Sequence, residues 1–281
     1  MKHLETSYLT HDGLQLYLQA CLPDSPKAGL LLIHGLGEHS GRYAPLVDRL
    51  VAEGVAVFTF DGRGHGRSVA GKPDAYFASY RDYLEDIDAL FGKVLAYLPG
   101  LPAFLYGHSM GGGMAAGYVI RYQPHAAGVI LSSPAIKEAE NTSKLLIAIS
   151  GMISKWLPRL KALKLDATRI SRIPEEVRAY LSDSLNYTQA IPARTAHEVY
   201  QLMQMIQADA ASFELPVLVV HGTEDGLTNP KGSELFVQKA QTEDKTLRLF
   251  PGGYHELIRD HDREEMIQTV VDWVKERVRV N

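Results

Sequence analysis

The sequence is poor in cysteine and in excess charge. Cys21 is the single cysteine among 281 residues, so no intrachain disulfide can form and no CxxC pair is present. The formal net charge is only -4, which provides no basic field that would attract a nucleic-acid backbone. We therefore expect a reducing compartment and no nucleic-acid partner.

Long apolar runs and metal-ligand motifs are also missing. The first ten residues, MKHLETSYLT, contain no continuous apolar stretch, so we expect neither a signal peptide nor an anchor and predict a cytoplasmic protein. The most apolar later stretch, residues 145–157, is interrupted by Gly151 and Lys155 and is too short for a bilayer of ~30 Å. No HExxH or EF-hand pattern occurs and the histidines are scattered, so we expect no metal and no organic cofactor.

What the sequence does contain is a regular alternation of short apolar segments with segments of helical periodicity. This alternation predicts an α/β fold with a mostly parallel central sheet, opened by an antiparallel hairpin around the turn His11-Asp12-Gly13. The hairpin is expected at 4–10 and 14–22, buried strands at 29–35, 55–61, 102–109, 127–133, 215–222 and 245–253, and helices at 42–53, 80–97, 110–122, 231–241 and 262–278. Functional side chains should gather where the parallel strands end.

One interval breaks this alternation. About eighty residues separate the strand that ends near Ser133 from the strand that starts near Leu215, several times an ordinary connection. We therefore predict a single α/β core, residues 1–134 and 213–281, with a helical cap inserted at 135–212.

The segment Gly107-His108-Ser109-Met110-Gly111 lies between a predicted strand and a predicted helix, which is the context of a nucleophile elbow. A serine in such a strained turn needs glycine two positions before and after it, because bulkier side chains would collide with the crossing backbone. The alternative is a glycine-rich turn with an incidental serine. The acid and base found downstream argue against it.

A serine hydroxyl needs a base to remove its proton and an acid to orient that base, here in the chain order Ser, acid, His. Asp225 follows a predicted strand in the loop HGTEDGLTNP, and His255 follows the last predicted strand in FPGGYHEL. Glu224 is the rival acid, but a neighbour in the same turn points elsewhere; the rival base, His261, falls near a helix start. We predict a catalytic triad of Ser109, Asp225 and His255.

An oxyanion formed by attack of the serine needs two backbone N–H donors. Met110 follows the nucleophile and supplies one donor, and Leu36, in the loop HGLG at 34–37, supplies the other. The alternative is that HGLG only makes a tight turn. A further glycine-rich segment, DGRGHGRS at 61–68, matches neither a P-loop nor a dinucleotide fingerprint and is interpreted as scaffolding.

Five motifs together resemble the monoacylglycerol lipase and lysophospholipase family of α/β-hydrolases over nearly the whole chain. They are HGLGEHSGRY at 34–43, DGRGHGRS at 61–68, GHSMGGG at 107–113, HGTEDGLTNP at 221–230 and PGGYHEL at 251–257. The resemblance implies the α/β-hydrolase fold and a serine hydrolase that acts on lipid esters such as monoacylglycerol.

The resemblance also implies substrate-binding residues. Glu38 and Arg42 match a glutamate and an arginine near the polar end of the family's pocket, and Tyr180 matches a cap tyrosine that precedes a D-P-L segment. Ser184 replaces the proline of that segment. Leu36 stands where the family lipase has a small residue, and Ile258 stands where a polar histidine would help to hold glycerol.

Other activities remain open within this fold, because fold and triad alone do not fix the leaving group. They are a lysophospholipase, a short-chain carboxylesterase, an aminopeptidase, a carbon-carbon bond hydrolase and a non-catalytic binding protein. An aminopeptidase should offer acidic cap residues to the substrate's ammonium group, whereas 141–172 contains seven Lys or Arg residues and a single acid, Asp166. A complete triad argues against a binding protein.

The first part of the cap has an amphipathic basic pattern. Its apolar residues recur at helical spacing, with cations on another face and Pro158 at the end: Leu145, Leu146, Ile149, Met152, Ile153, Trp156 and Leu160, against Lys144, Lys155 and Arg159. One interpretation is a helix whose apolar side covers the active site and whose cations face water. The other is that Asn141 to Leu165 forms a lid resting peripherally on an anionic membrane surface.

Overall fold

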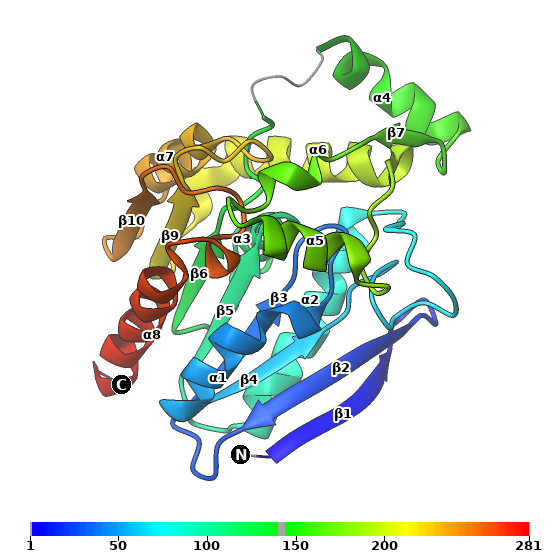
Figure 1. Cartoon of the computed structure of the whole chain (residues 1–281). Coiled ribbons are helices and arrows are strands. Elements are labelled where there is room, and N and C mark those ends of the chain that lie inside the picture. Colours follow the sequence, from blue (N-terminus) through cyan, green and yellow to red (C-terminus); the bar gives the residue numbers. More distant parts are fainter. Residues whose placement is uncertain (1, 140–143, 281) are drawn as a thin grey trace.

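The computed structural model describes residues 2–139 and 144–280 of the chain. Eight of its strands form one sheet in the order β1-β2-β4-β3-β5-β6-β9-β10 (Figure 1). These strands are β1 Lys2–Leu9, β2 Gln15–Leu22, β3 Ala28–Ile33, β4 Val55–Phe60, β5 Ala103–His108, β6 Gly128–Ser132, β9 Val217–Gly222 and β10 Lys245–Phe250. β1 pairs antiparallel with β2, and β2 with β4, whereas all other neighbours are parallel.

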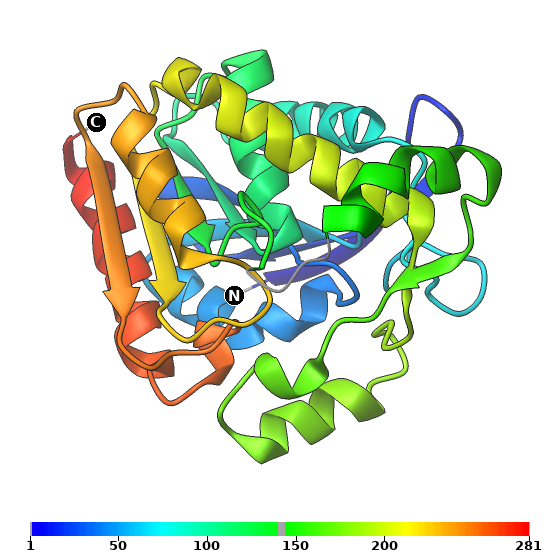
Figure 2. The same cartoon turned by 90° about the horizontal axis from the view of Figure 1, so that it is seen from above.

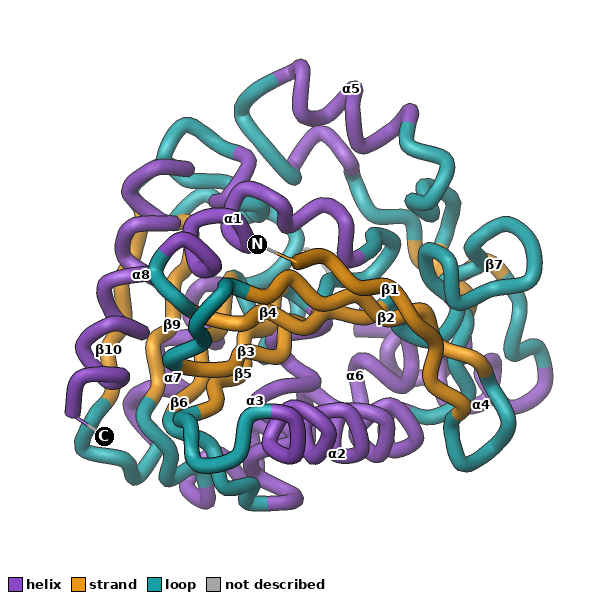
Figure 3. Tube along the Cα trace, turned by 90° about the horizontal axis from the view of Figure 1, so that it is seen from below, coloured by secondary structure: helices purple, strands orange, loops and turns teal. Residues whose placement is uncertain are grey.

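Helices cover both faces of this sheet. They are α1 Ala44–Ala52 after the 3-10 turn η1 Ser40–Tyr43, α2 Tyr80–Tyr97, α3 Met110–Tyr122, α7 Pro230–Lys239 and α8 Arg263–Val280 after η4 Leu257–Arg259. Side chains of α1 and α8 share one buried cluster with strand residues such as Leu30 and Val220, and those of α2, α3 and α7 share another with residues such as Leu105 and Val219. Figure 3 shows the sheet lying between the two helical layers. The predicted α/β-hydrolase architecture with its N-terminal hairpin is confirmed.

The buried strands follow directly from their composition. β3, β5, β6 and β9 consist of apolar or small residues apart from His108 and His221, and every residue in them is buried. Strands covered by helices on both faces have no exposed side, so the sequence needs no polar alternation. The edge strand β1 has one face open to water and is mostly exposed.

Between β6 and β9 the chain runs above the carboxyl ends of the strands, as Figure 2 shows from above. This insertion contains α4 Lys144–Trp156, β7 Lys161–Leu163, η2 Ala167–Arg169, α5 Pro174–Ser182, β8 Ile191–Pro192, α6 Ala193–Asp209 and η3 Ala210–Ser212, with β7 and β8 paired as a small ribbon. Leu202 and Ile206 of α6 belong to the same buried cluster as α2 and α3, so α6 roots the insertion in the core. We propose that residues 135–212 act as the cap, although Glu140 to Ser143 lie outside the described residues.

No helix built from the described residues is both long and apolar enough to cross a membrane.

Candidate active site

Ser109 occupies a sharp turn between β5 and α3. Its φ of 52° and ψ of -118° lie outside the regions that L-residues ordinarily adopt, as expected for a strained nucleophile elbow. A Cβ on Gly107 would collide with the backbone of Gly111, and a Cβ on Gly111 would collide with the carbonyl oxygens of Ile33 and His34. The two glycines of the motif are therefore required by close backbone approach, as the sequence predicts.

Asp225 and His255 come from the loops after β9 and β10 and meet beside the elbow. His255 Nδ1 donates to Asp225 Oδ2 at 2.7 Å, and the aspartate side chain is fully buried. The His255 ring lies 4.8 Å, centroid to centroid, from the ring of His108, which directly precedes Ser109. Ser109 and His255 both line one cavity. The structure thus brings the three predicted triad residues together at the carboxyl edge of the sheet.

Three further residues hold Asp225 in place. Its Oδ1 accepts the backbone N–H groups of Leu227 and Thr228 at 2.8 and 3.0 Å. Its Oδ2 also accepts the Thr228 hydroxyl at 2.9 Å and His221 Nε2 at 3.1 Å. Burial would raise the pKa of Asp225, but the neighbouring His255 and the hydrogen bonds from His221 and His255 hold it well below its ordinary value. Asp225 is therefore a fixed anion facing His255.

The two neighbouring histidines are tuned in opposite directions. Burial would lower the pKa of His255, but the Asp225 carboxylate outweighs burial and raises it above 6.5. Burial and the proximity of His255 lower the pKa of His108 to about 3, so this ring stays neutral. Only His255 is suited to take up a proton near neutral pH.

The two predicted oxyanion donors come from the loop after β3, which contains Leu36, and from the start of α3. Leu36 and Met110 both line the cavity, and within the described residues neither backbone N–H donates a hydrogen bond. Met110 is the first residue of α3, where N–H groups have no helical partner. Gly35 N–H donates to Glu38 Oε1 at 2.6 Å, which fixes the loop just before Leu36.

Glu38 and Arg42 belong to a buried ion-pair cluster at one end of the cavity. Arg42 Nε donates to Glu38 Oε2 at 3.1 Å, and its Nη2 donates to Glu256 Oε2 at 2.5 Å. Tyr43 donates its hydroxyl to Glu38 Oε1 at 2.5 Å. Burial raises the pKa of Glu256, with Arg42 opposing this effect. Glu38 and Glu256 line the cavity, whereas Arg42 lies behind them and joins the two carboxylates.

Tyr180, on α5, closes the same end of the cavity. Its hydroxyl donates to Gly37 O at 3.3 Å, and the Arg42 guanidinium lies 4.9 Å from its ring centroid. Ile258, in contrast, is buried in the core cluster of α8 rather than on the cavity wall.

The cavity itself has a volume of about 520 Å³. Away from the triad, the insertion contributes mainly apolar side chains to its wall, among them Ile153, Leu165, Ile191, Val199 and Met203. The size is typical of small-molecule sites, which are mostly apolar with a few converging polar groups.

Several residues of the site could not be identified from the sequence motifs. His221 and Thr228 support Asp225, Ser133 donates its hydroxyl to His255 O at 2.8 Å, and Glu256 holds Arg42. Their only signal is position, because each lies within a few residues of the end of a parallel strand. Among the described residues, no cluster of three His, Cys, Asp or Glu side chains is placed to hold a metal ion.

The chain is similar to known proteins over almost its whole length. Residues 24–262 match a family model described as serine aminopeptidase, S33. A monoacylglycerol lipase of Mycolicibacterium smegmatis is 34% identical over 271 residues, 96% of each chain. The crystal structure of Paleococcus ferrophilus monoacylglycerol lipase superposes with a TM-score of 0.82 at 31% identity, covering 92% of this chain and 99% of that one. A soluble variant of monoglyceride lipase from Saccharomyces cerevisiae, solved with a substrate analog, gives a TM-score of 0.86 at 25% identity, covering 98% and 94%.

Proposed function

The chain belongs to the α/β-hydrolase family described as serine aminopeptidase S33, alongside the monoacylglycerol lipases, and we propose that it hydrolyses monoacylglycerols through Ser109, His255 and Asp225. It is a serine hydrolase of the lipase and esterase type. The observation that carries the proposal is the placement of the elbow serine and the Asp225-bound histidine on the wall of one largely apolar cavity.

In the proposed reaction, His255 removes the proton of Ser109 as the serine oxygen attacks the ester carbonyl. The amides of Leu36 and Met110 receive the oxyanion, and Asp225 stabilises the imidazolium that forms. His255 then gives its proton to the leaving alcohol, which leaves an acyl group on Ser109. Water, deprotonated by the same histidine, attacks this acyl-enzyme, and His255 returns the proton to the Ser109 oxygen as the fatty acid is released.

The shape and chemistry of the cavity support a substrate with one acyl chain and a small polar alcohol. The apolar wall formed by the insertion suits a chain, and the polar end with Glu38, Glu256 and Tyr180 suits hydroxyl groups. The relatives named above include three described as monoacylglycerol or monoglyceride lipases, which adds weight to this substrate class.

The nucleophile can be tested by covalent labelling. A fluorophosphonate should label the wild-type chain once, and Ser109→Ala should abolish both labelling and ester hydrolysis, since no other serine combines the elbow with the acid and base. Labelling and hydrolysis at the wild-type rate in Ser109→Ala would refute the assignment.

A panel of substrates tests the proposed substrate class. We would compare p-nitrophenyl esters from acetate to palmitate with a monoacylglycerol, lysophosphatidylcholine and an aminoacyl anilide. The expected order places monoacylglycerol first. The family model's description makes an aminopeptidase the second candidate, and dominant turnover of the anilide would favour it.

A further inference from the structure

Glu256 is a buried carboxylate on the cavity wall, directly after the proposed base. Its backbone N–H donates to Ile170 O at 2.7 Å, which fixes its position against the cap. Its side chain is only 7% exposed, and Oε2 is occupied by Arg42. Within the described residues Oε1 has no hydrogen-bond partner, and it is not among the fully buried atoms left unpaired. Because Glu256 lines the cavity, this oxygen is open to whatever the cavity holds.

The cations near Glu256 are already shared with other acids. Arg42 serves both Glu256 and Glu38, and both oxygens of Glu38 are occupied by groups of the protein. Arg259, the next cation, donates to Glu176 Oε2 at 2.9 Å and to the backbone of Arg42. The two carboxylates on this part of the cavity wall, Glu38 and Glu256, thus share the single guanidinium group of Arg42, which leaves an excess of negative charge there.

We propose that Glu256 is a specificity residue, whose Oε1 accepts a hydrogen bond from a hydroxyl of the substrate's alcohol part and whose charge rejects phosphate-bearing headgroups. The inference rests on the proposed ester hydrolysis and narrows it to neutral polyol esters. A hydroxyl needs one acceptor, which Oε1 supplies, whereas an ammonium group carries three donors. A phosphate group placed here would face like charge in a site shielded from water, where repulsion is strong.

The experiment uses three esters with the same acyl chain. They are 1-octanoylglycerol, its 3-phosphate, and ethyl octanoate, which has neither a free hydroxyl nor a charge. The kcat/KM of each is measured for wild type, Glu256→Gln and Glu138→Gln. The control removes a carboxylate from another part of the same cavity wall.

In wild type the glycerol ester should exceed the phosphate ester by roughly a hundredfold, since like-charge exclusion adds to the hydrogen bond. In Glu256→Gln this ratio should shrink by roughly tenfold or more, mainly through faster turnover of the phosphate ester. Ethyl octanoate should stay within about twofold of wild type, because it does not use Oε1. Glu138→Gln should keep the wild-type ratio.

Comparable wild-type turnover of the phosphate and glycerol esters would overturn the proposal without any variant, even if Glu256→Gln does not fold. An unchanged ratio in Glu256→Gln would also overturn it, as would an equal loss on all three esters, which would mean that Glu256 acts only through the loop it supports. Failure of wild type to hydrolyse any of the esters would instead refute the proposed ester hydrolysis.

Discussion

Asp225 shows how much of the site's chemistry depends on contacts that a motif does not contain. The carboxylate accepts hydrogen bonds from five donors, three of them from Leu227 and Thr228 immediately downstream. This arrangement keeps a fully buried charge ionised, because the cost of burial is offset by hydrogen bonds and by His255. Glu224, the rival acid, is exposed, and its backbone rather than its carboxylate contacts Arg169.

Asp225→Asn should lower kcat by roughly 10⁴-fold, because the amide can neither hold the required tautomer of His255 nor stabilise its positive charge. Glu224→Gln, the matched change one residue away, should leave kcat close to wild type. Steady-state kinetics on one ester would check both. If Glu224→Gln were the damaging variant, the acid would have to be reassigned.

The pH dependence of kcat/KM should report the raised pKa of His255. The base must be neutral to accept the serine proton, so activity is lost as the pH falls through that pKa. The midpoint of the acidic limb should therefore lie above 6.5, the ordinary value for imidazole. In Asp225→Asn the main cause of the raised pKa is gone, and the limb of the residual activity should move to lower pH. A wild-type midpoint below 6.5, or no movement in the variant, would contradict this.

The same shift has a consequence for stability. Because the pKa of His255 is raised in the folded state, this residue contributes fully to stability below its unfolded-state pKa. That contribution is lost as the pH rises through the folded-state pKa. The lowered pKa of Asp225 acts in the opposite direction, with its contribution present above the unfolded-state pKa and lost as the pH falls.

For individual residues, the sequence predicts the position of a catalytic side chain where a motif requires a particular backbone geometry. The glycines around Ser109 and the loops of Asp225 and His255 could be placed because few backbones allow an exposed serine in a strained turn. Glu256 could not be assigned, because its contact with Arg42 joins two loops that are far apart in the chain. Arg42 lies behind Glu38 and Glu256 and bonds to both, and its role in substrate binding stays a prediction.

At the scale of elements, helices and strands of the core matched the periodicity closely. The predicted helices at 80–97 and 110–122 are α2 and α3 within the same bounds, because α2 has an apolar face and a capping serine, Ser79, and α3 starts directly after the elbow and is buried along almost its whole length. The short strands of the insertion could not be predicted from the sequence. β7 and β8 are very short and carry no alternation, and they pair only because the chain returns over the cavity.

Residues 171–172 of the insertion are hydrogen-bonded to residues 254–260, the segment that carries His255. Asp260 Oδ1 accepts Arg172 N–H at 3.1 Å, and Oδ2 accepts Arg172 Nε at 2.8 Å and Tyr254 N–H at 2.9 Å. Ser171 Oγ donates to Arg259 O at 2.7 Å in the same contact between the insertion and the His255 segment. Because Tyr254 precedes the base, Asp260 links the position of the cap to the position of His255.

Asp260→Asn should therefore destabilise the fold by about 3 kcal/mol and also lower kcat, because an NH2 group would face two backbone or side-chain donors in a buried site. Asp262→Asn is the matched control, since within the described part of the chain the Asp262 carboxylate hydrogen-bonds only to Arg172 Nη2. Urea unfolding and kinetics on one ester would measure both effects. If the two variants lowered stability and kcat by the same small amount, the contacts of Asp260 would not position His255.

At the scale of the whole molecule, the outer surface of the insertion differs from the rest of the protein. Met152 is 62% exposed and Trp156 74% exposed, with Leu157 and Leu160 beside them. Both interpretations of this helix stay predictions: Ile153 lines the cavity, as a cover requires, whereas Met152 and Trp156 are exposed to the outside. α4 packs against α6, and this contact includes the hydrogen bond between Ser150 Oγ and His197 Nδ1 at 2.9 Å.

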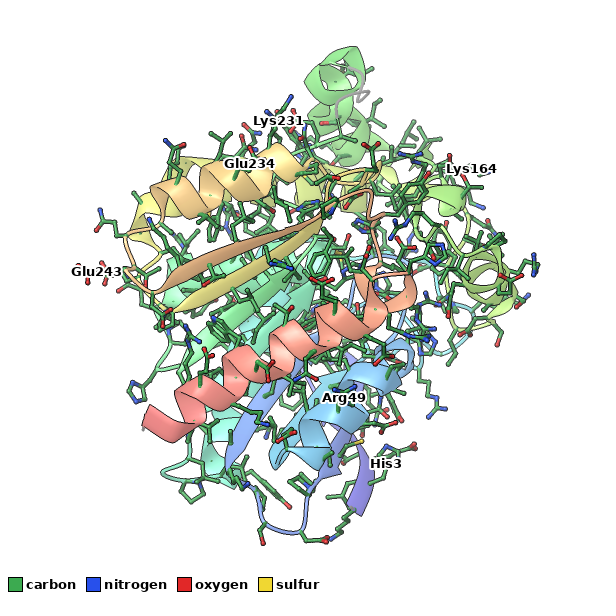
Figure 4. All side chains as sticks on the ribbon, turned by 60° about the vertical axis from the view of Figure 1, so that its left-hand side comes forward. His3, Arg49, Lys164, Lys231, Glu234 and Glu243 are labelled. Atoms are coloured by element: carbon green, nitrogen blue, oxygen red, sulfur yellow. The ribbon has the colours of Figure 1, made fainter. Side chains whose placement is uncertain are left out.

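The cations of this surface also divide into two kinds. Arg159 donates to Asp74 Oδ2 at 2.7 Å and lies 4.0 Å from the ring centroid of Tyr76, so it holds the insertion on the core. Lys155 and Lys164 are exposed, and Figure 4 shows Lys164 at the upper edge of the molecule, far from His3. The side chain of Lys144, and all of Asn141, lie outside the described residues.

We predict that this surface contacts anionic membranes, with Trp156 at the headgroup level and Lys155 and Lys164 near the lipid phosphates. Lys155→Gln/Lys164→Gln should weaken co-sedimentation with anionic vesicles severalfold at ~0.05 M salt, and the difference should largely vanish at ~0.5 M salt, where charges are screened. Trp156→Ser should weaken binding at both salt concentrations, since it removes apolar contact with the lipid.

The control variant, Lys2→Gln/Lys27→Gln, makes the same charge change at the opposite end of the molecule and should bind like wild type. Retaining Arg159 in all variants keeps the insertion fastened to Asp74, so a loss of binding reports the surface and not a displaced cap. If wild type binds neutral and anionic vesicles equally weakly at both salt concentrations, the surface is a cover exposed to water and not a membrane contact.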